Sequence, residues 1–294
     1  ETRGGFSAPL FTPVIQMGMD VSLYKCNNWE EYSKIQRTHD LLSEEEYASF
    51  SAQHPGSYSD WTQEVKDLYS EMYKRMDKAK DKELSDADAE AECIELPSEL
   101  YPDEHFKIGY FRSSYNDGGI NNVARSLGLP GLYDIFGESS NSTEEDYYWV
   151  IDWERAKEIA EDAVKQWEIF VNSDAAKYYV TEARYFQPRE GVTPIKGKAG
   201  AMEAFLAQQK KGIQYDFRSG TGSFFKKPVR VVALIQGEAE FVFGGVQNVS
   251  SFLIIENEDR MYDYYLKSME IVLETIEYVL RKKDPSKYRL AWSS

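Results

Sequence analysis

Residues 229–280 read VRVVALIQGEAEFVFGGVQNVSSFLIIENEDRMYDYYLKSMEIVLETIEYVL, which is a run of strand patterns followed by one long helix pattern. The apolar and β-branched runs predict three strands, at 229–235, 240–243 and 252–256. A Gly-Gly turn separates the last two. The helix is expected to begin at Glu258 or Asp259 and to end at the cations of 281–283, which suit a helix C-terminus. Its apolar stripe comprises Tyr262, Tyr265, Leu266, Met269, Leu273, Ile276 and Leu280.

Strands and helices do not alternate regularly along the rest of the chain. Strands are expected at 20–26 and 106–111, and helices at 120–127, 152–171 and 199–210. Residues 175–186 are expected to continue the helix of 152–171 after a break. This order favours an α+β fold with a mixed or antiparallel sheet and packed helices.

Most of the chain's charge lies in residues 27–104. This segment holds 21 Asp and Glu against 8 Lys and Arg, a balance of −13 within a chain of −16. Such a field repels nucleic acid and attracts basic protein surfaces. Helices are expected at 29–35, at 44–53 behind a capping box formed by Ser43 and Glu46, and after Ser59. The segment is therefore predicted to be an acidic helical hairpin that projects from the body.

Three parts are expected. Residues 1–16 form an extended arm or a non-native remnant, residues 17–26 and 105–294 form the main α+β body, and residues 27–104 form the acidic helical insertion. The candidate interaction residues combine acidic and aromatic side chains of that insertion. They are Glu64, Asp67, Glu71, Trp61, Tyr69 and Tyr73.

The segment GYFRSSYNDGG, residues 109–119, has the strongest local chemistry for a small anion. An Arg fork, hydroxyls and a Gly pair before a helix favour an anionic ligand. The candidate ligand residues are Arg112, Ser113, Ser114, Tyr115, Asn116, Gly118 and Gly119. The alternative is a polar loop whose side chains satisfy their own backbone. The segment matches neither nucleotide-binding glycine fingerprint.

The sequence assigns no catalytic, cofactor-binding or metal-binding residue. The three histidines, His39, His54 and His105, have no partner at metal-ligand spacing. Cys26 and Cys93 lie in no zinc or redox spacing, and Cys26 is expected to be a buried thiol. These observations favour a non-enzymatic protein over an enzyme.

No apolar run of membrane-spanning length and no secretory leader pattern occurs in the sequence. A cytoplasmic location in a bacterial host cell is therefore expected, without membrane contact. The wide apolar face of the last helix is compatible with a homo-oligomer.

Three features together resemble an uncharacterised family of phage and bacterial proteins. They are Met17-Gly18-Met19-Asp20 before a strand, GYFRSSYNDGG, and the closing Tyr-rich helix. The resemblance implies a phage or prophage origin and implies no activity and no site residue. Residues 1–16 lie outside it.

The leading hypothesis is an acidic protein-interaction protein whose partner offers a basic surface. With a phage origin, the hypothesis becomes an inhibitor that binds a host DNA-acting defence protein. One alternative is an enzyme or small-anion binder that uses the loop of residues 109–119. Another is a virion structural component.

Overall fold

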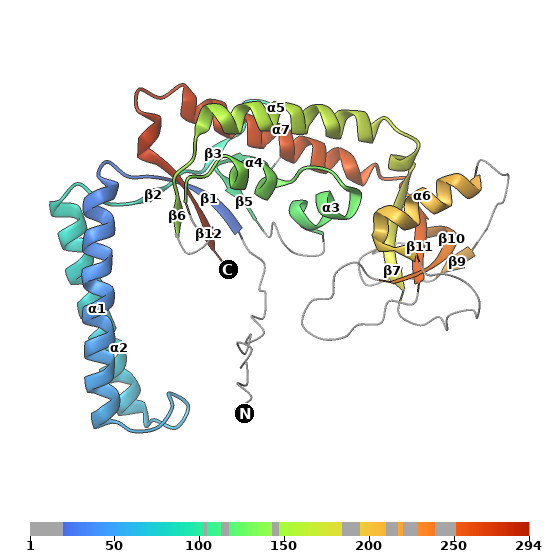
Figure 1. The fold of residues 1–294 in the computed structure, drawn as a ribbon. Coiled ribbons are helices and arrows are strands. Elements are labelled where there is room, and N and C mark those ends of the chain that lie inside the picture. The colour runs from blue at the N-terminus through green and yellow to red at the C-terminus, as the bar shows by residue number, and fades with distance from the viewer. Residues whose placement is uncertain are drawn as a thin grey trace, which may run out of the picture.

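The computed structural model shows an α+β protein with a projecting helical hairpin, as predicted (Figure 1). It describes residues 20–102, 105–112, 118–142, 147–183, 195–209, 217–219, 229–238 and 251–293. The predicted arm of residues 1–16 lies outside the described residues. Three parts follow one another across the view: the hairpin, a central sheet with two long helices, and a second sheet with one helix.

The central sheet joins the two ends of the described chain. Its order is β2-β1-β12-β6, with β5 also paired to β1. Strand β1 pairs antiparallel with β12 along its whole length, so that Leu23 lies opposite Leu290. The five strands are β1 (Asp20–Lys25), β2 (Glu92–Cys93), β5 (Tyr110–Phe111), β6 (Tyr148–Trp149) and β12 (Tyr288–Ser293).

Helices α5 (Trp153–Val171) and α7 (Met261–Leu280) lie side by side over the central sheet (Figure 1). Asp152 caps α5 by accepting a hydrogen bond from the backbone N–H of Arg155. Alanines on the buried face of α5 allow close approach of α7. The core under the two helices includes Val21, Leu23, Trp167, Met269, Ile276 and Leu290.

The short helices α3 (Ile120–Leu127) and α4 (Leu132–Glu138) close the side of this core. The predicted helix at 120–127 is confirmed. The predicted strand at 106–111 is divided into β4 (Lys107–Ile108), which pairs with β3 (Leu96–Pro97), and β5. Gly109 separates β4 from β5 with a φ of +85°, a value that favours glycine.

The second sheet is inserted between α5 and α7. Its order is β7-β11-β10-β8, with β9 paired to β10. Among the strand pairs that the structure describes in this sheet, only β8–β10 is parallel. Helix α6 (Gly197–Gln209) packs on it through Phe205. The strands are β7 (Tyr178–Ala183), β8 (Ile195–Lys196), β9 (Phe217–Ser219), β10 (Val229–Glu238) and β11 (Ser251–Glu256). The strand predicted at 240–243 lies outside the described residues.

The prediction that residues 175–186 continue a helix is wrong. A single 3-10 turn, η1 (Ala175–Lys177), leads directly into β7. Tyr178, Tyr179, Val180 and Thr181 are aromatic or β-branched and suit a pleated surface. Since β7 pairs with β11 in continuous register, tertiary pairing reinforces that preference.

The hairpin consists of α1 (Trp29–Gln53) and α2 (Gln63–Asp86). The two helices predicted at 29–35 and 44–53 are one helix, because residues 36–43 contain no Gly or Pro to stop it. Thr62, rather than Ser59, caps α2 by accepting from the Val65 N–H. At about 1.5 Å per residue, each helix is about 36 Å long.

A buried carboxylate connects the segment after the hairpin to α7. Glu274 accepts hydrogen bonds from the Ser98 hydroxyl and the Glu99 backbone N–H. We expect Glu274→Gln to lower the free energy of unfolding by about 1–2 kcal/mol, because Gln keeps only one acceptor oxygen and its NH2 group cannot accept the second hydrogen bond. Urea denaturation measures the change, with the more exposed Glu277→Gln on the same helix as control. Equal stability of the two variants would contradict this role for Glu274.

Candidate functional site

The acidic segment has two stretches without Lys or Arg, and one of them forms the free end of the hairpin. Residues 38–65 contain six Asp and Glu and no Lys or Arg. Glu44, Glu45 and Glu64 in this stretch are exposed. The second stretch, residues 83–102, contains seven Asp and Glu and lies near the root of the hairpin. The acidic block is therefore divided into two regions, with all its cations lying outside both.

Ion pairs offset part of the charge along the length of the hairpin. Arg75 on α2 contacts Glu46 on α1 at 2.9 Å, and Lys82 contacts Asp86 within α2 at 3.1 Å. The His39 ring on α1 is hydrogen-bonded to Glu83 on α2 at 2.9 Å. Exposed pairs of this kind contribute little to stability. The pair with Arg75 does reduce the charge of Glu46, which is one of the six carboxylates of residues 38–65.

The free end also carries a cluster of aromatic rings, here called the tip cluster. It comprises Tyr47, Phe50, His54, Tyr58, Trp61, Tyr69 and Tyr73. Tyr69 is its centre, with ring centroids 5.3 Å from Trp61, 5.5 Å from Phe50 and 4.7 Å from Tyr73. The hydrogen bond to Tyr73 raises the pKa of Tyr69 to about 12, so this centre is uncharged at neutral pH.

The rings of the tip cluster differ in exposure. Trp61 is only 8 % exposed and donates its indole N–H to the His54 carbonyl at 3.0 Å. Tyr47 is 45 % and Tyr58 57 % exposed. Trp61 therefore supports the cluster from inside, while the two tyrosines offer ring surface to a partner.

The predicted interaction residues lie on or near this end of the hairpin. Glu64, Asp67 and Glu71 are exposed on α2, and Asp67 accepts a hydrogen bond from Gln63 at 2.8 Å. Their role in binding stays a prediction.

Sequence reasoning missed the α1 half of the cluster. Tyr47, Phe50 and His54 follow one another at spacings of three and four residues, which places them on one helix face. That spacing is the signal that could have found them.

A joint holds the hairpin to the central body. Trp29, in the first turn of α1, donates its indole N–H to the Lys287 carbonyl at 2.9 Å. The Tyr32 hydroxyl is hydrogen-bonded to that of Tyr148 on β6 at 3.1 Å. Lys287 also donates its ammonium to the Asn27 amide oxygen at 3.0 Å. These contacts tie both the C-terminal segment and β6 to the base of α1.

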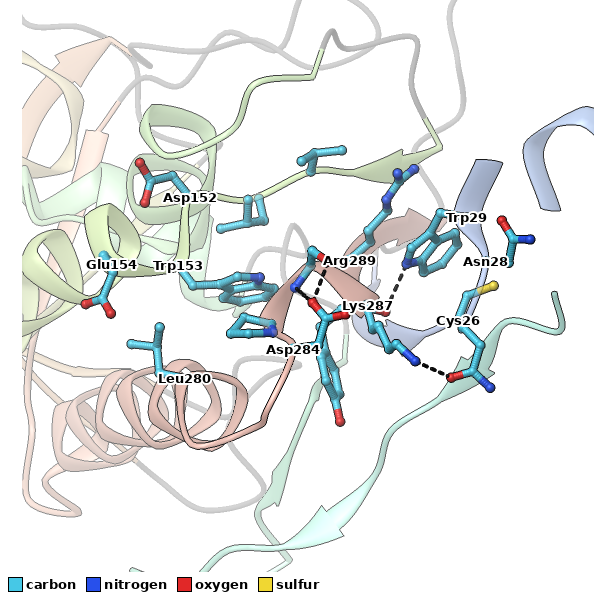
Figure 2. Close-up of a pocket in the computed structure, with 16 residues that line it drawn as sticks. Cys26, Asn28, Trp29, Asp152, Trp153, Glu154, Leu280, Asp284, Lys287 and Arg289 are labelled. Carbon is cyan, nitrogen blue, oxygen red and sulfur yellow. Dashed lines mark hydrogen bonds between the residues drawn. The ribbon is translucent and has the colours of Figure 1, made fainter. Parts of the chain in front are cut away.

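A cavity of about 600 Å³ lies beside this joint (Figure 2). Its walls come from the β1–α1 connection, the first turn of α5 and the connection from α7 to β12. Among the residues labelled in Figure 2, Arg289 and Trp29 point toward one another, and the guanidinium lies 4.7 Å from the indole ring centre.

Several polar groups of the cavity are engaged within the fold. Asp152 caps α5, and Asp284 accepts hydrogen bonds from the N–H and hydroxyl of Ser286. Cys26 is buried, as predicted, and burial raises the pKa of its thiol. A thiol in that state is a poor nucleophile. The arrangement fits a structural joint better than a reactive centre.

The candidate anion loop is described only at its two ends. Arg112 is exposed directly after β5. Gly118 accepts a hydrogen bond from the Tyr265 hydroxyl at 2.8 Å, and Gly119 precedes α3. Ser113, Ser114, Tyr115 and Asn116 lie outside the described residues. The anion site therefore stays a prediction.

The described part of the chain shows neither a metal-binding cluster nor a membrane-spanning helix. No three His, Cys, Asp or Glu side chains there are grouped so that they could hold a metal ion. None of the helices there combines the length and the apolar content needed to cross a bilayer.

Comparison with protein-family models, with curated proteins and with solved structures finds no match to this chain.

Proposed function

We propose that this chain is a protein-binding protein whose hairpin α1–α2 meets a basic surface on a nucleic-acid-binding partner. The observation that carries the proposal is the coincidence, at the free end of the hairpin, of residues 38–65 and the tip cluster. Clustered carboxylates steer a cationic partner toward the tip. Exposed aromatic side chains then supply contact area at low entropic cost.

The joint at the root supports this use of the hairpin. A recognition element that is already ordered loses less conformational freedom when it binds. Trp29 and Tyr32 attach α1 to the body through two hydrogen bonds from different side chains. The tip is thereby presented at the end of a rod about 36 Å long.

We propose, more narrowly, that the partner is a DNA-binding protein. Proteins that bind DNA neutralise phosphates with Lys and Arg along a track. Carboxylates on a rigid helix pair can occupy such a track. Given the phage origin that the sequence resemblance implies, the chain would then be an inhibitor of a host DNA-acting defence protein.

Affinity capture from a bacterial lysate tests the proposal. The full chain is immobilised, and bound proteins are identified at about 50 and 500 mM salt, because exposed charge contacts weaken as the screening length shortens. We expect basic, nucleic-acid-binding proteins at the lower salt. The variant with Glu44→Gln, Glu45→Gln and Glu64→Gln is expected to recover them at least about ten-fold less.

The matched control neutralises three exposed carboxylates on α5, namely Glu154→Gln, Glu158→Gln and Glu168→Gln. It changes the net charge equally and leaves the hairpin intact. If both variants lose the captured proteins equally, general charge and not the hairpin is responsible. Recovery of no nucleic-acid-binding protein at either salt would reject the proposed partner class.

A further inference from the structure

We infer that the tip cluster is an anchoring site for arginine side chains of the basic partner, held on the exposed ring faces of Tyr47 and Tyr58. This inference rests on the proposed function and adds the chemistry by which the tip recognises its partner. An aromatic face attracts a cation placed within about 6 Å of the ring centre.

One such contact already exists within the chain. The ammonium of Lys66, at the start of α2, lies 5.3 Å from the centre of the Tyr58 ring. Tyr58 therefore offers its face to a cation in this arrangement. A guanidinium from a partner would compete with Lys66 for the same ring, and its planar shape stacks better than an ammonium.

Carboxylates accompany the rings. Glu44 precedes Tyr47 by three residues on α1, so the two side chains are neighbours on one helix face. Asp60 follows Tyr58 by two residues. Hydrogen bonds from the Ser57 hydroxyl and N–H hold the pKa of Asp60 below its usual value, which keeps this carboxylate ionised. Ring faces beside carboxylates favour a group that is both planar and positive.

The negative charge of the tip favours an arginine-rich partner over a second copy of the chain or an apolar partner. A second copy of the chain would bring two segments 38–65, each with six carboxylates and no Lys or Arg, against one another. Like charges brought together oppose that contact. An apolar partner would desolvate the same carboxylates without pairing them. An arginine-rich segment satisfies both the rings and the carboxylates.

The test uses the full chain with two probes, nona-arginine and nona-lysine peptides, in calorimetric titrations at about 50 and 150 mM salt. We expect nona-arginine to bind more tightly than nona-lysine. The double variant Tyr47→Ala with Tyr58→Ala is expected to weaken nona-arginine binding about ten-fold and to remove the preference for arginine. Its control, Tyr133→Ala with Tyr264→Ala, removes two exposed tyrosines outside the hairpin and is expected to bind like the wild type.

A second pair of variants leaves the tip tyrosines in place. Lys66→Gln and Lys74→Gln each remove one cation from α2, but only Lys66 lies over a ring in this arrangement. Both are expected to tighten binding through charge. Lys66→Gln is expected to tighten nona-arginine binding about two-fold more than Lys74→Gln, because it also uncovers Tyr58.

The outcomes separate the inference from the proposed function. If both peptides bind equally and all variants match their controls, the anchoring inference is overturned and a purely electrostatic hairpin remains. If neither peptide binds the wild type at the lower salt, the proposed function fails as well. A dimer in light scattering that the double tyrosine variant abolishes would overturn the inference in favour of a second copy at the tip.

Discussion

Replacing Trp29 with alanine is expected to lower the free energy of unfolding of the hairpin root by about 3–5 kcal/mol, the usual cost of removing a buried tryptophan. The indole packs 4.9 Å from the Tyr148 ring and 5.5 Å from the Tyr32 ring. It also stacks with Arg289 and donates its N–H to the Lys287 carbonyl. One side chain thus links α1, β6 and the segment that leads into β12.

Hydrogen exchange resolves where the stability is lost. In Trp29→Ala, peptides from α1 and α2 should lose protection while peptides from α5 and α7 keep theirs. Trp29→Phe retains most of the ring packing without the N–H and should cost about 1–2 kcal/mol. Tyr147→Ala, which removes an exposed ring close to the same joint, is the control. Equal loss of protection in α5 and α7 would show that hairpin and body unfold as one unit.

Trp29→Ala also separates the contribution of a rigid hairpin root to partner binding from the contribution of direct contacts at the tip. Trp29 lies at the opposite end of α1 from the tip cluster, so its removal deletes no contact with a partner there. A loosened root must nevertheless be ordered again on binding, at about 0.5–1.5 kcal/mol for each side chain that is immobilised. Weaker binding of a basic partner by Trp29→Ala is therefore expected to have an entropic origin.

Locally encoded elements were predictable from sequence. Helix α5 has its cap at Asp152 and an uninterrupted apolar stripe, and its predicted and observed bounds agree. Strand β12 was not foreseen, because a six-residue strand has little local signal and this one is defined by pairing with β1 at the other end of the chain. The wrong prediction of a helix at residues 175–186 has the same origin, because the strand β7 found there is defined by its pairing with β11.

The sequence predicted that a helical hairpin projects from the body. It predicted only part of the candidate interaction surface on that hairpin. The predicted stripe after Ser59 supplied Trp61, Tyr69 and Tyr73, because the three share one helical spacing, although in the structure Trp61 lies just before α2. Their partners Tyr47 and Phe50 were missed because the predicted break before Ser43 hid the continuity of α1. Likewise, the sign of the acidic block and its two stretches without Lys or Arg follow from counting, but the position of residues 38–65 at the free end follows from the way in which α1 and α2 are paired.

Replacing Trp167 on α5 with alanine is expected to lower the free energy of unfolding of the central body by about 3–5 kcal/mol. Trp167 is 0 % exposed and donates its indole N–H to the Pro130 carbonyl at 2.9 Å. Its ring stacks on Tyr265 of α7, with centroids 6.0 Å apart. The substitution leaves a cavity between the two helices and a carbonyl that has lost its donor.

Ile169→Ala is the matched control for this prediction. Ile169 lies two residues further along the same helix and is 73 % exposed, so its loss should change stability by less than about 0.5 kcal/mol. Because α5 and α7 share one core with the central sheet, Trp167→Ala should reduce exchange protection in both helices and in β1 and β12. Protection at the tip of the hairpin should be unaffected, since α1 contacts the body through Trp29 and Tyr32. If the two variants unfold at the same denaturant concentration, the contact of Trp167 with α7 does not stabilise the central body.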